Sequence, residues 1–144
     1  MRWATLLVLA CLACLACNDL RDFRGSWEGS RLGGPPVLRV GAGDRATLLI
    51  DNLDAHGLQG RLAVDGLLPE VAFESLPGAE ADALASLTFA GSPLRVYLAF
   101  VPVADGGGDV FVVTALYDDR RVEVRLLRGG GSPVYAIFAL GETP

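Results

Sequence analysis

The sequence that decides the fold lies in the second half of the chain, in LRVYLAFVPV (94–103), VFVVTALY (110–117), RVEVRLL (121–127) and VYAIFAL (134–140). These four segments are rich in Val, Leu, Phe and Tyr, which favour β-strands. Short connections rich in Gly and Asp separate them, at 105–109, 118–119 and 129–132. Connections this short join antiparallel neighbours, because a parallel crossover needs about a dozen residues. The segments therefore predict four consecutive hairpin-linked strands.

Alternation along these segments predicts which side chains are buried, since successive residues of a strand point to opposite faces. The apolar sets that we expect in the core are Leu94, Val96, Leu98 and Phe100 in the first segment and Val122, Val124 and Leu126 in the third. The residues between them, which we expect to face solvent, are Arg95, Tyr97, Glu123 and Arg125.

The first half repeats the pattern in shorter segments, at 23–31, 37–40, 46–51, 58–64 and 70–76, with turn residues such as Asp65-Gly66 between them. Only 79–87 has a helix-like composition without β-branched residues, and it predicts a short helix or turn near 79–86 that runs into a short strand at 87–89. The whole chain predicts an all-β fold, an antiparallel meander of about eight to ten strands that forms a small closed barrel or a sandwich.

The N-terminus has the layout of an export signal. Arg2 precedes an apolar run from Trp3 to Ala16, and polar residues follow Cys17. A run of 14 residues is too short for a hydrocarbon core of about 30 Å, which needs about 20 helical residues, so the pattern favours cleavage. We expect a signal peptide at 1–16, a short tether at 17–22 and a single β domain at 23–144.

The segment Cys14-Leu15-Ala16-Cys17 resembles the lipobox of bacterial lipoproteins. The resemblance implies that Cys17 is acylated, becomes the new N-terminus and anchors the protein to membrane lipid, with Cys14 and Cys11 as the alternative positions. Asn18 at the second mature position favours the outer membrane. No cysteine follows Cys17, so the exported part cannot form an internal disulfide.

The acidic balance of the chain argues against nucleic acid as a partner. All 12 basic residues are arginine, and loss of Arg2 with the signal leaves 11 arginines against 17 acidic residues. An acidic domain of this kind is not expected to bind nucleic acid.

Gly25-Ser26-Trp27 resembles the G-x-W motif that opens the first strand of lipocalins and avidin-like barrels, the calycins. The resemblance implies that Trp27 plugs one end of a barrel under an arginine from a late strand, Arg125 or Arg128, with a cation-π contact between them. Trp27 and Arg125 are then the candidate ligand pocket. The alternative is that Trp27 is a core aromatic on the first strand.

Two further motifs suggest ligands but favour plainer interpretations. Residues 41–46, GAGDRA, satisfy G-x-G-x-x-A, with Asp65 about 20 residues on, as in a dinucleotide site. That site needs a helix next and further βαβ units, so we interpret the motif as a hairpin turn. Asp105-Gly-Gly-Gly-Asp109 offers two carboxylates, fewer oxygen ligands than calcium needs, and predicts a loop without metal.

Candidate catalytic groups are sparse. His56 is the only histidine, and no nucleophile motif accompanies it, so we expect a turn residue. Asp118 and Asp119 are expected at a hairpin tip, and Glu123 on a solvated strand face. We therefore predict a non-catalytic protein that needs no cofactor.

The leading hypothesis is a structural or interaction module of the cell envelope, whose partner is another envelope protein. The alternative is a lipocalin-like carrier of a small apolar ligand. A carrier needs an open cavity of about 300 Å³ or more. An interaction module needs a filled core and an exposed apolar or Arg/Tyr-rich face, for example around Arg95 and Tyr97.

Overall fold

The computed structural model describes residues 20–33, 43–76, 89, 91–102, 109–128 and 134–144. Within these residues it contains eight antiparallel strands and one 3-10 turn, which confirms the predicted all-β meander. The elements are η1 (Leu20–Phe23), β1 (Gly25–Gly33), β2 (Arg45–Leu53), β3 (Leu58–Val64), β4 (Leu68–Glu74), β5 (Arg95–Pro102), β6 (Asp109–Leu116), β7 (Val122–Arg128) and β8 (Val134–Glu142). The strand expected at 37–40 and the helix or turn expected near 79–86 lie outside the described residues.

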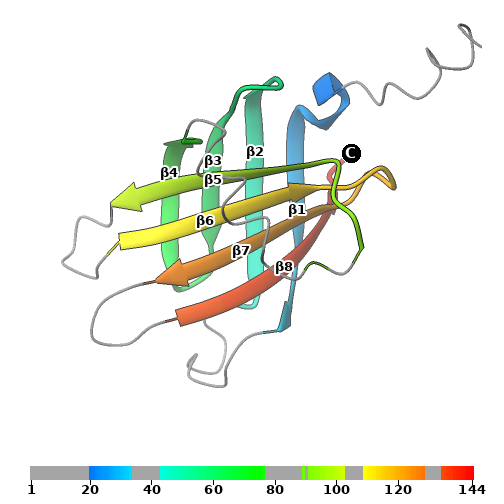
Figure 1. Ribbon diagram of the computed structural model, residues 1–144. Helices are drawn as coiled ribbons and strands as arrows, with labels where there is room; N and C mark the ends of the chain where they lie inside the picture. The colour runs from blue at the N-terminus through cyan, green and yellow to red at the C-terminus, as the bar shows by residue number, and fades with distance from the viewer. Residues whose placement is uncertain (1–19, 34–42, 77–88, 90, 103–108, 129–133) are drawn as a thin grey trace, which may run out of the picture.

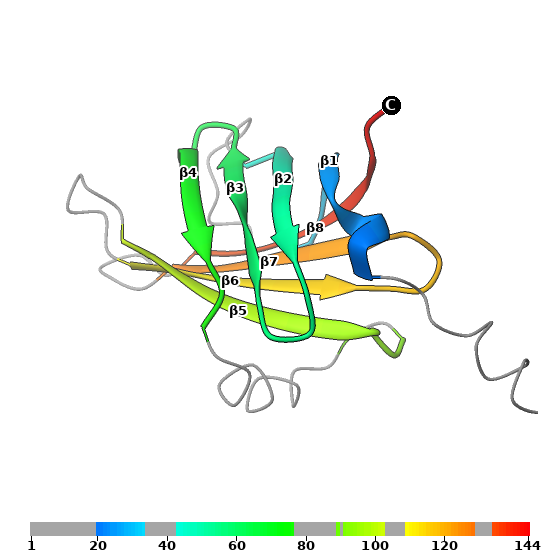
Figure 2. The ribbon, with the colours of Figure 1, turned by 90° about the horizontal axis from the view of Figure 1, so that it is seen from above.

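The strands form one continuous sheet in the order β4-β3-β2-β1-β8-β7-β6-β5. The sheet folds over on itself, so that β1–β4 and β5–β8 face each other with their strands crossing steeply (Figures 1 and 2). We call these the N-terminal and C-terminal half-sheets. Their free edges meet at a bridge between Ser75 and Ala99, where the Leu76 N–H donates to the Leu98 carbonyl at 2.7 Å. The result is a nearly closed barrel.

Strand β1 forms the corner where the two half-sheets join, because it pairs with β2 on one side and with β8 on the other. The strands approach closely there. A Cβ atom at Gly29 would lie 1.8 Å from the carbonyl oxygen of Ala139. Only glycine fits at this point of the corner.

The inward faces of both half-sheets supply one hydrophobic core. Its largest fully buried side chains are Trp27, Phe138, Leu48, Ile50, Leu53, Leu58, Leu62, Leu116 and Leu140. Burial of each contributes about 1.5–3 kcal/mol to folding. A side chain that lined a water-sized cavity would keep accessible surface, and these keep between 0 and 1%. The described interior is therefore filled.

The core face predicted for β5 is wrong, and the core face predicted for β7 is confirmed. Val122, Val124 and Leu126 lie in the core as expected. In β5 the core face is the other one, with Tyr97, Ala99 and Val101. Both faces of this strand carry apolar side chains, so alternation alone does not decide between them. Tyr97 was expected to face solvent because its hydroxyl is polar. In the structure this hydroxyl donates a hydrogen bond to the Asp54 carbonyl at 2.7 Å, which allows the ring to lie at the edge of the core.

Candidate interaction surface

The outer face of the N-terminal half-sheet is polar and solvated. Glu28 of β1 pairs with Arg45 of β2. On β3, Arg61 lies 3.6 Å from the carboxylate of Asp51 and 3.8 Å from that of Glu70. All of these side chains are substantially exposed. Exposed pairs of this kind contribute little to stability and keep the face in water.

The outer face of the C-terminal half-sheet is different, because its side chains are mostly apolar. Strand register arranges them in rows that cross the strands. The covered row contains Leu98, Val113 and Arg125. The exposed row, two residues or about 7 Å further along each strand, contains Phe100, Phe111 and Leu127.

The covered row is buried beneath the connection between β4 and β5. We call this connection, residues 75–94, the crossover segment, and the structure describes 75–76, 89 and 91–94 of it. Leu76 and Phe89 pack against Leu98 and Val113, which are buried although they point away from the barrel core. The segment returns to the sheet where the Leu94 N–H donates to the Leu116 carbonyl at 2.7 Å. Part of the chain therefore forms a second layer outside the C-terminal half-sheet.

An ion pair lies beneath this second layer. Arg125 Nε donates to Glu123 Oε1 at 2.5 Å, and the two residues are 7% and 3% exposed. The Arg125 guanidinium stacks over the Phe89 ring, 4.4 Å from its centroid. The prediction that Glu123 and Arg125 face solvent is wrong. Both are buried, Phe89 of the crossover segment lies over Arg125, and the two charges pair with each other on the same strand.

Tyr117 extends this polar group toward the β6–β7 turn. Its hydroxyl donates to Glu123 Oε2 at 3.4 Å, and the Arg121 guanidinium lies 3.9 Å from its ring centroid. Burial, with the nearby Glu123 carboxylate, raises the pKa of Tyr117. The neutral phenol therefore remains a hydrogen-bond donor to the buried carboxylate.

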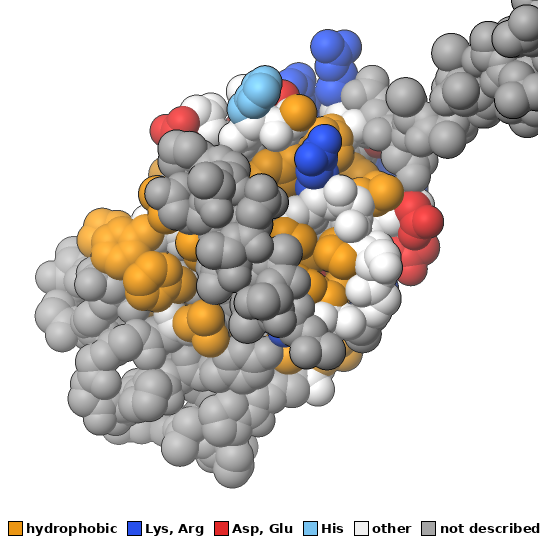
Figure 3. All heavy atoms as spheres, viewed as in Figure 1, with side chains coloured by type: hydrophobic (Ala, Val, Ile, Leu, Met, Phe, Trp, Pro, Cys, Tyr) orange, Lys and Arg blue, Asp and Glu red, His pale blue; other side chains and the backbone are white. Residues whose placement is uncertain are grey.

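The exposed row begins where the covered row ends. Phe100 and Phe111 are cross-strand partners that pack edge to face, with ring centroids 5.2 Å apart, and they are 39% and 40% exposed. Leu127, the partner of Phe111 on β7, is half-buried. Figure 3 looks onto this face, and orange hydrophobic side chains gather at the left, over the end of β5 and the start of β6. This exposed aromatic pair is the candidate interaction surface among the described residues.

Trp27 closes the opposite end of the barrel. It is 0% exposed, its Nε1–H donates to the Phe23 carbonyl at 2.8 Å, and the two rings stack with centroids 5.7 Å apart. Turn η1 thus caps the core through Phe23. Trp27 is packed as a core aromatic.

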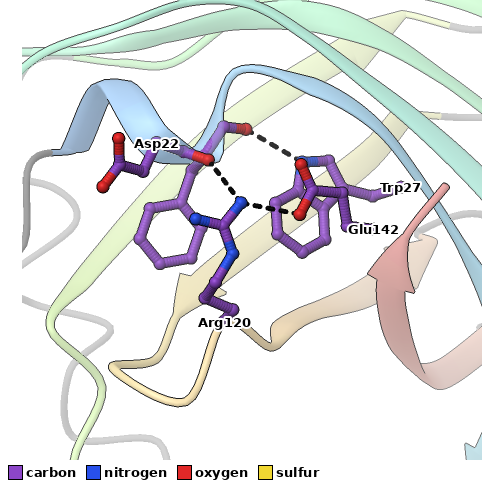
Figure 4. A network of polar contacts seen from close by, with 5 residues as sticks. Asp22, Trp27, Arg120 and Glu142 are labelled. Atoms are coloured by element: carbon purple, nitrogen blue, oxygen red, sulfur yellow. Dashed lines mark hydrogen bonds and ion pairs between the residues drawn. The ribbon is translucent and has the colours of Figure 1, made fainter. Parts of the chain in front are cut away.

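The arginine that reaches this end is Arg120, in the β6–β7 turn (Figure 4). Its Nη2 donates to the Asp22 carbonyl at 3.1 Å and to Glu142 Oε2 at 2.6 Å, and so ties η1 to β8. Arg120 has a φ of 56°, the one positive φ among the described residues other than glycine. Arg125, the arginine predicted to cover Trp27, points outward to Phe89, so the structure does not bring the two together. The side chain of Arg128 lies outside the described part.

His56 lies in the β2–β3 turn, as predicted. Asp54 Oδ1 accepts the backbone N–H groups of His56 at 2.7 Å and of Gly57 at 3.0 Å, and these bonds lower the pKa of Asp54. A cleft of about 360 Å³ borders this turn and reaches Glu74 and Ser75. Its polar groups are already engaged in the fold, since the Leu58 N–H donates to Ser75 Oγ at 2.8 Å and Gln59 donates to Glu74.

The remaining candidates are placed as follows. Strand β2 begins at Arg45, where a dinucleotide site needs a helix, so the hairpin interpretation of GAGDRA is confirmed in its described part. Asp118 and Asp119 form the tip of the β6–β7 hairpin, as predicted. Cys17 and residues 105–108 lie outside the described residues, and Asp109, expected in the same loop, is the first residue of β6. Among those that are described, no group of three or more His, Cys, Asp or Glu side chains could hold a metal ion.

Comparison of the chain with protein-family models, with curated proteins and with solved structures finds no match. The fold itself defines the class, an all-β protein with a nearly closed antiparallel barrel. In the described part of the chain, no helix is both long and apolar enough to cross a membrane.

Proposed function

We propose that this protein is an acylated lipoprotein of the bacterial cell envelope, anchored through Cys17, outer membrane favoured, and that its β domain is a non-catalytic interaction module. The observation that carries the second part is the exposed row of Phe100, Phe111 and Leu127 on the outer face of the C-terminal half-sheet. The solvated outer face of the N-terminal half-sheet offers no comparable patch among its described residues.

The packing of the barrel favours this function over a lipocalin-like carrier. A carrier with Trp27 at the base of its cup would leave water-accessible surface on the inward side chains. Trp27 and Phe138 have none, and the rest of the described core is similarly closed. The apolar surface that remains available is on the outside of the barrel.

Turn η1, which would follow the anchor, and the exposed row lie at opposite ends of the C-terminal half-sheet. From Cys17 to Leu20 the chain spans at most about 10 Å, so η1 would stay close to the lipid. Arg120 ties the β6–β7 turn to η1. Phe111 is five residues back along β6 from the end of that strand, about 17 Å. The exposed row would therefore be presented away from the anchor, where it is available to another protein.

The anchor is tested by the intact mass and membrane partitioning of the full chain expressed in a bacterial host, beside Cys17→Ser. We expect the wild type to begin at an acylated Cys17 and to sediment with membranes, and the variant to be released or left unprocessed. Wild type and variant that are both soluble and begin elsewhere would overturn the lipoprotein assignment.

The interaction surface is tested by a photo-cross-linking phenylalanine analogue at position 111 in living cells. The control places the analogue at Thr47, which is exposed on the outer face of the N-terminal half-sheet. We expect a discrete protein adduct from position 111 that is absent from position 47. Equal labelling from both positions, or none from position 111, contradicts the proposal.

A further inference from the structure

Resting on the proposed function, we propose that the exposed row binds a short extended segment of a partner protein, with an aromatic or large aliphatic side chain placed on Phe100 and Phe111. Such a segment would cross the strands beside the crossover segment. The site consists of Phe100, Phe111 and Leu127, which are neighbours on three adjacent strands.

The neighbouring row shows what this face accommodates. The crossover segment contributes Leu76 and Phe89 to the covered row, and the Phe89 ring lies against Arg125. Neither residue belongs to a strand. The face therefore already accepts apolar side chains from residues outside the strands, and the exposed row continues that contact surface by one step of about 7 Å.

The apolar area that the described residues expose on this face is smaller than a second copy of this protein would bury. Two phenylalanine rings about 40% exposed, with part of Leu127, offer roughly 200 Å² of apolar surface. A stable protein dimer buries about 800 Å² on each partner. An area of roughly 200 Å² matches the contact of a few side chains from one extended segment.

Addition of a strand at the edge of β5 is disfavoured as the binding mode. The Leu98 carbonyl, which points to this edge, already accepts the Leu76 N–H. Two residues beyond Phe100, the edge ends at Pro102, which has no N–H to donate. The partner segment would therefore be held by its side chains on the face of the sheet.

The experiment is a selection of random twelve-residue linear peptides displayed on phage against the acylated full chain in detergent micelles. Peptides are then measured individually by fluorescence anisotropy against wild type, Phe111→Thr and the matched variant Leu49→Thr on the opposite outer face. We expect enriched peptides to share an aromatic or large aliphatic position, to bind wild type and Leu49→Thr equally, and to lose affinity about tenfold or more in Phe111→Thr.

Thermal unfolding of each variant keeps a loss of binding separate from a loss of fold. Absence of enrichment, or binding that Phe111→Thr leaves unchanged, overturns the proposal. Self-association of the chain that Phe111→Thr abolishes would identify a second copy as the occupant and would also overturn it. If cross-links form in cells from position 111 while no linear peptide binds, the interaction module stands and only the extended-segment inference fails.

Discussion

The two half-sheets have the same inward face and opposite outward faces. Inside, both contribute large apolar side chains to one core. Outside, the N-terminal half-sheet carries solvated ion pairs such as Arg61 with Asp51, whereas the C-terminal half-sheet carries Leu98, Val113 and a buried ion pair beneath a second layer. The difference teaches that the barrel alone needs only one apolar face per strand, and that the second apolar face of β5–β7 serves an additional contact.

Part of that additional contact is intramolecular. Leu76 and Phe89 of the crossover segment pack against Leu98 and Val113, whereas Phe100 and Phe111 remain about 40% exposed. Strands β5 and β6 therefore present a buried row and an exposed row that are both apolar. Substitutions in the covered row should therefore lower stability, whereas substitutions in the exposed row should lower binding to a partner.

The largest expected effect distinguishes the ion pairs of the two outer faces. Arg125→Ala leaves the Glu123 carboxylate buried without its cation, which should lower the free energy of unfolding by about 3–5 kcal/mol. Arg61→Ala, on the solvated face, should cost below about 1 kcal/mol. Urea denaturation at pH 7 measures both. Equal losses would show that the outward charges of the two faces are equivalent.

A double variant sharpens the same comparison. Glu123→Leu with Arg125→Met removes both charges and keeps apolar volume beneath Phe89. We expect it to recover most of the stability that Arg125→Ala loses, since replacing a buried pair is less costly than breaking one. A double variant as unstable as Arg125→Ala would instead assign the loss to packing against Phe89.

The second effect concerns the layer itself. Phe89→Ala removes the ring that packs over Arg125 and the covered row, and should cost about 2 kcal/mol, below the range for a fully buried phenylalanine. Leu32→Ala on β1, at a side chain that is mostly exposed, should change stability by below about 0.5 kcal/mol. Thermal unfolding of the two variants beside wild type measures the difference. If Phe89→Ala is as mild as Leu32→Ala, the crossover segment does not stabilise the outer face.

The contrast between the halves also explains what the sequence predicts well. The strands of the N-terminal half-sheet alternate apolar and polar residues, as in β3, where Leu58, Gly60, Leu62 and Val64 are buried and Gln59 and Arg61 are exposed. A strand with one apolar face has one way to pack. The approximate positions of the eight described strands were predictable, because turn residues separate most of the apolar segments.

The orientation of β5 was not predictable, because Val96, Leu98 and Phe100 alternate with Tyr97, Ala99 and Val101, and both sets are apolar enough to be buried. Burial of Glu123 and Arg125 was equally unpredictable, because Phe89, which lies over Arg125, is distant from both in the sequence. The role of Arg120 depends on the turn that brings it to Asp22, 98 residues away. Its one sequence signal is its position in the Asp118–Arg121 hairpin tip.

The third effect lies at the seam between the half-sheets, where Tyr97 of β5 donates to the Asp54 carbonyl in the β2–β3 turn. Tyr97→Phe should cost about 1 kcal/mol at pH 7 through loss of this hydrogen bond. Burial raises the pKa of Tyr97 to about 12. Because the folded state favours the neutral phenol, its contribution is full below about pH 10 and is lost as the pH rises toward 12.

The stability difference between wild type and Tyr97→Phe should therefore shrink between pH 10 and pH 12. Urea denaturation of both proteins at pH 7, 10 and 11.5 measures this difference. Tyr117 also has a raised pKa, but it is present in both proteins, so its titration cancels in the comparison. A difference that stays constant with pH would show that the Tyr97 phenol is not protected by the fold.

The smallest expected effect tests the boundary between the two rows. Threonine keeps strand propensity, so Phe111→Thr on the exposed row should change the free energy of unfolding by about 0.5 kcal/mol or less. The same residue introduced one row away, in Val113→Thr, places a hydroxyl beneath the crossover segment and should cost about 1–3 kcal/mol. Chemical denaturation of the two variants compares them. A phenylalanine whose loss leaves the fold intact, beside a valine whose loss does not, is not needed for folding and is free to contact a partner. If Phe111→Thr proved as costly as Val113→Thr, the exposed row would be part of the folded core, and the interaction surface would have to be sought elsewhere.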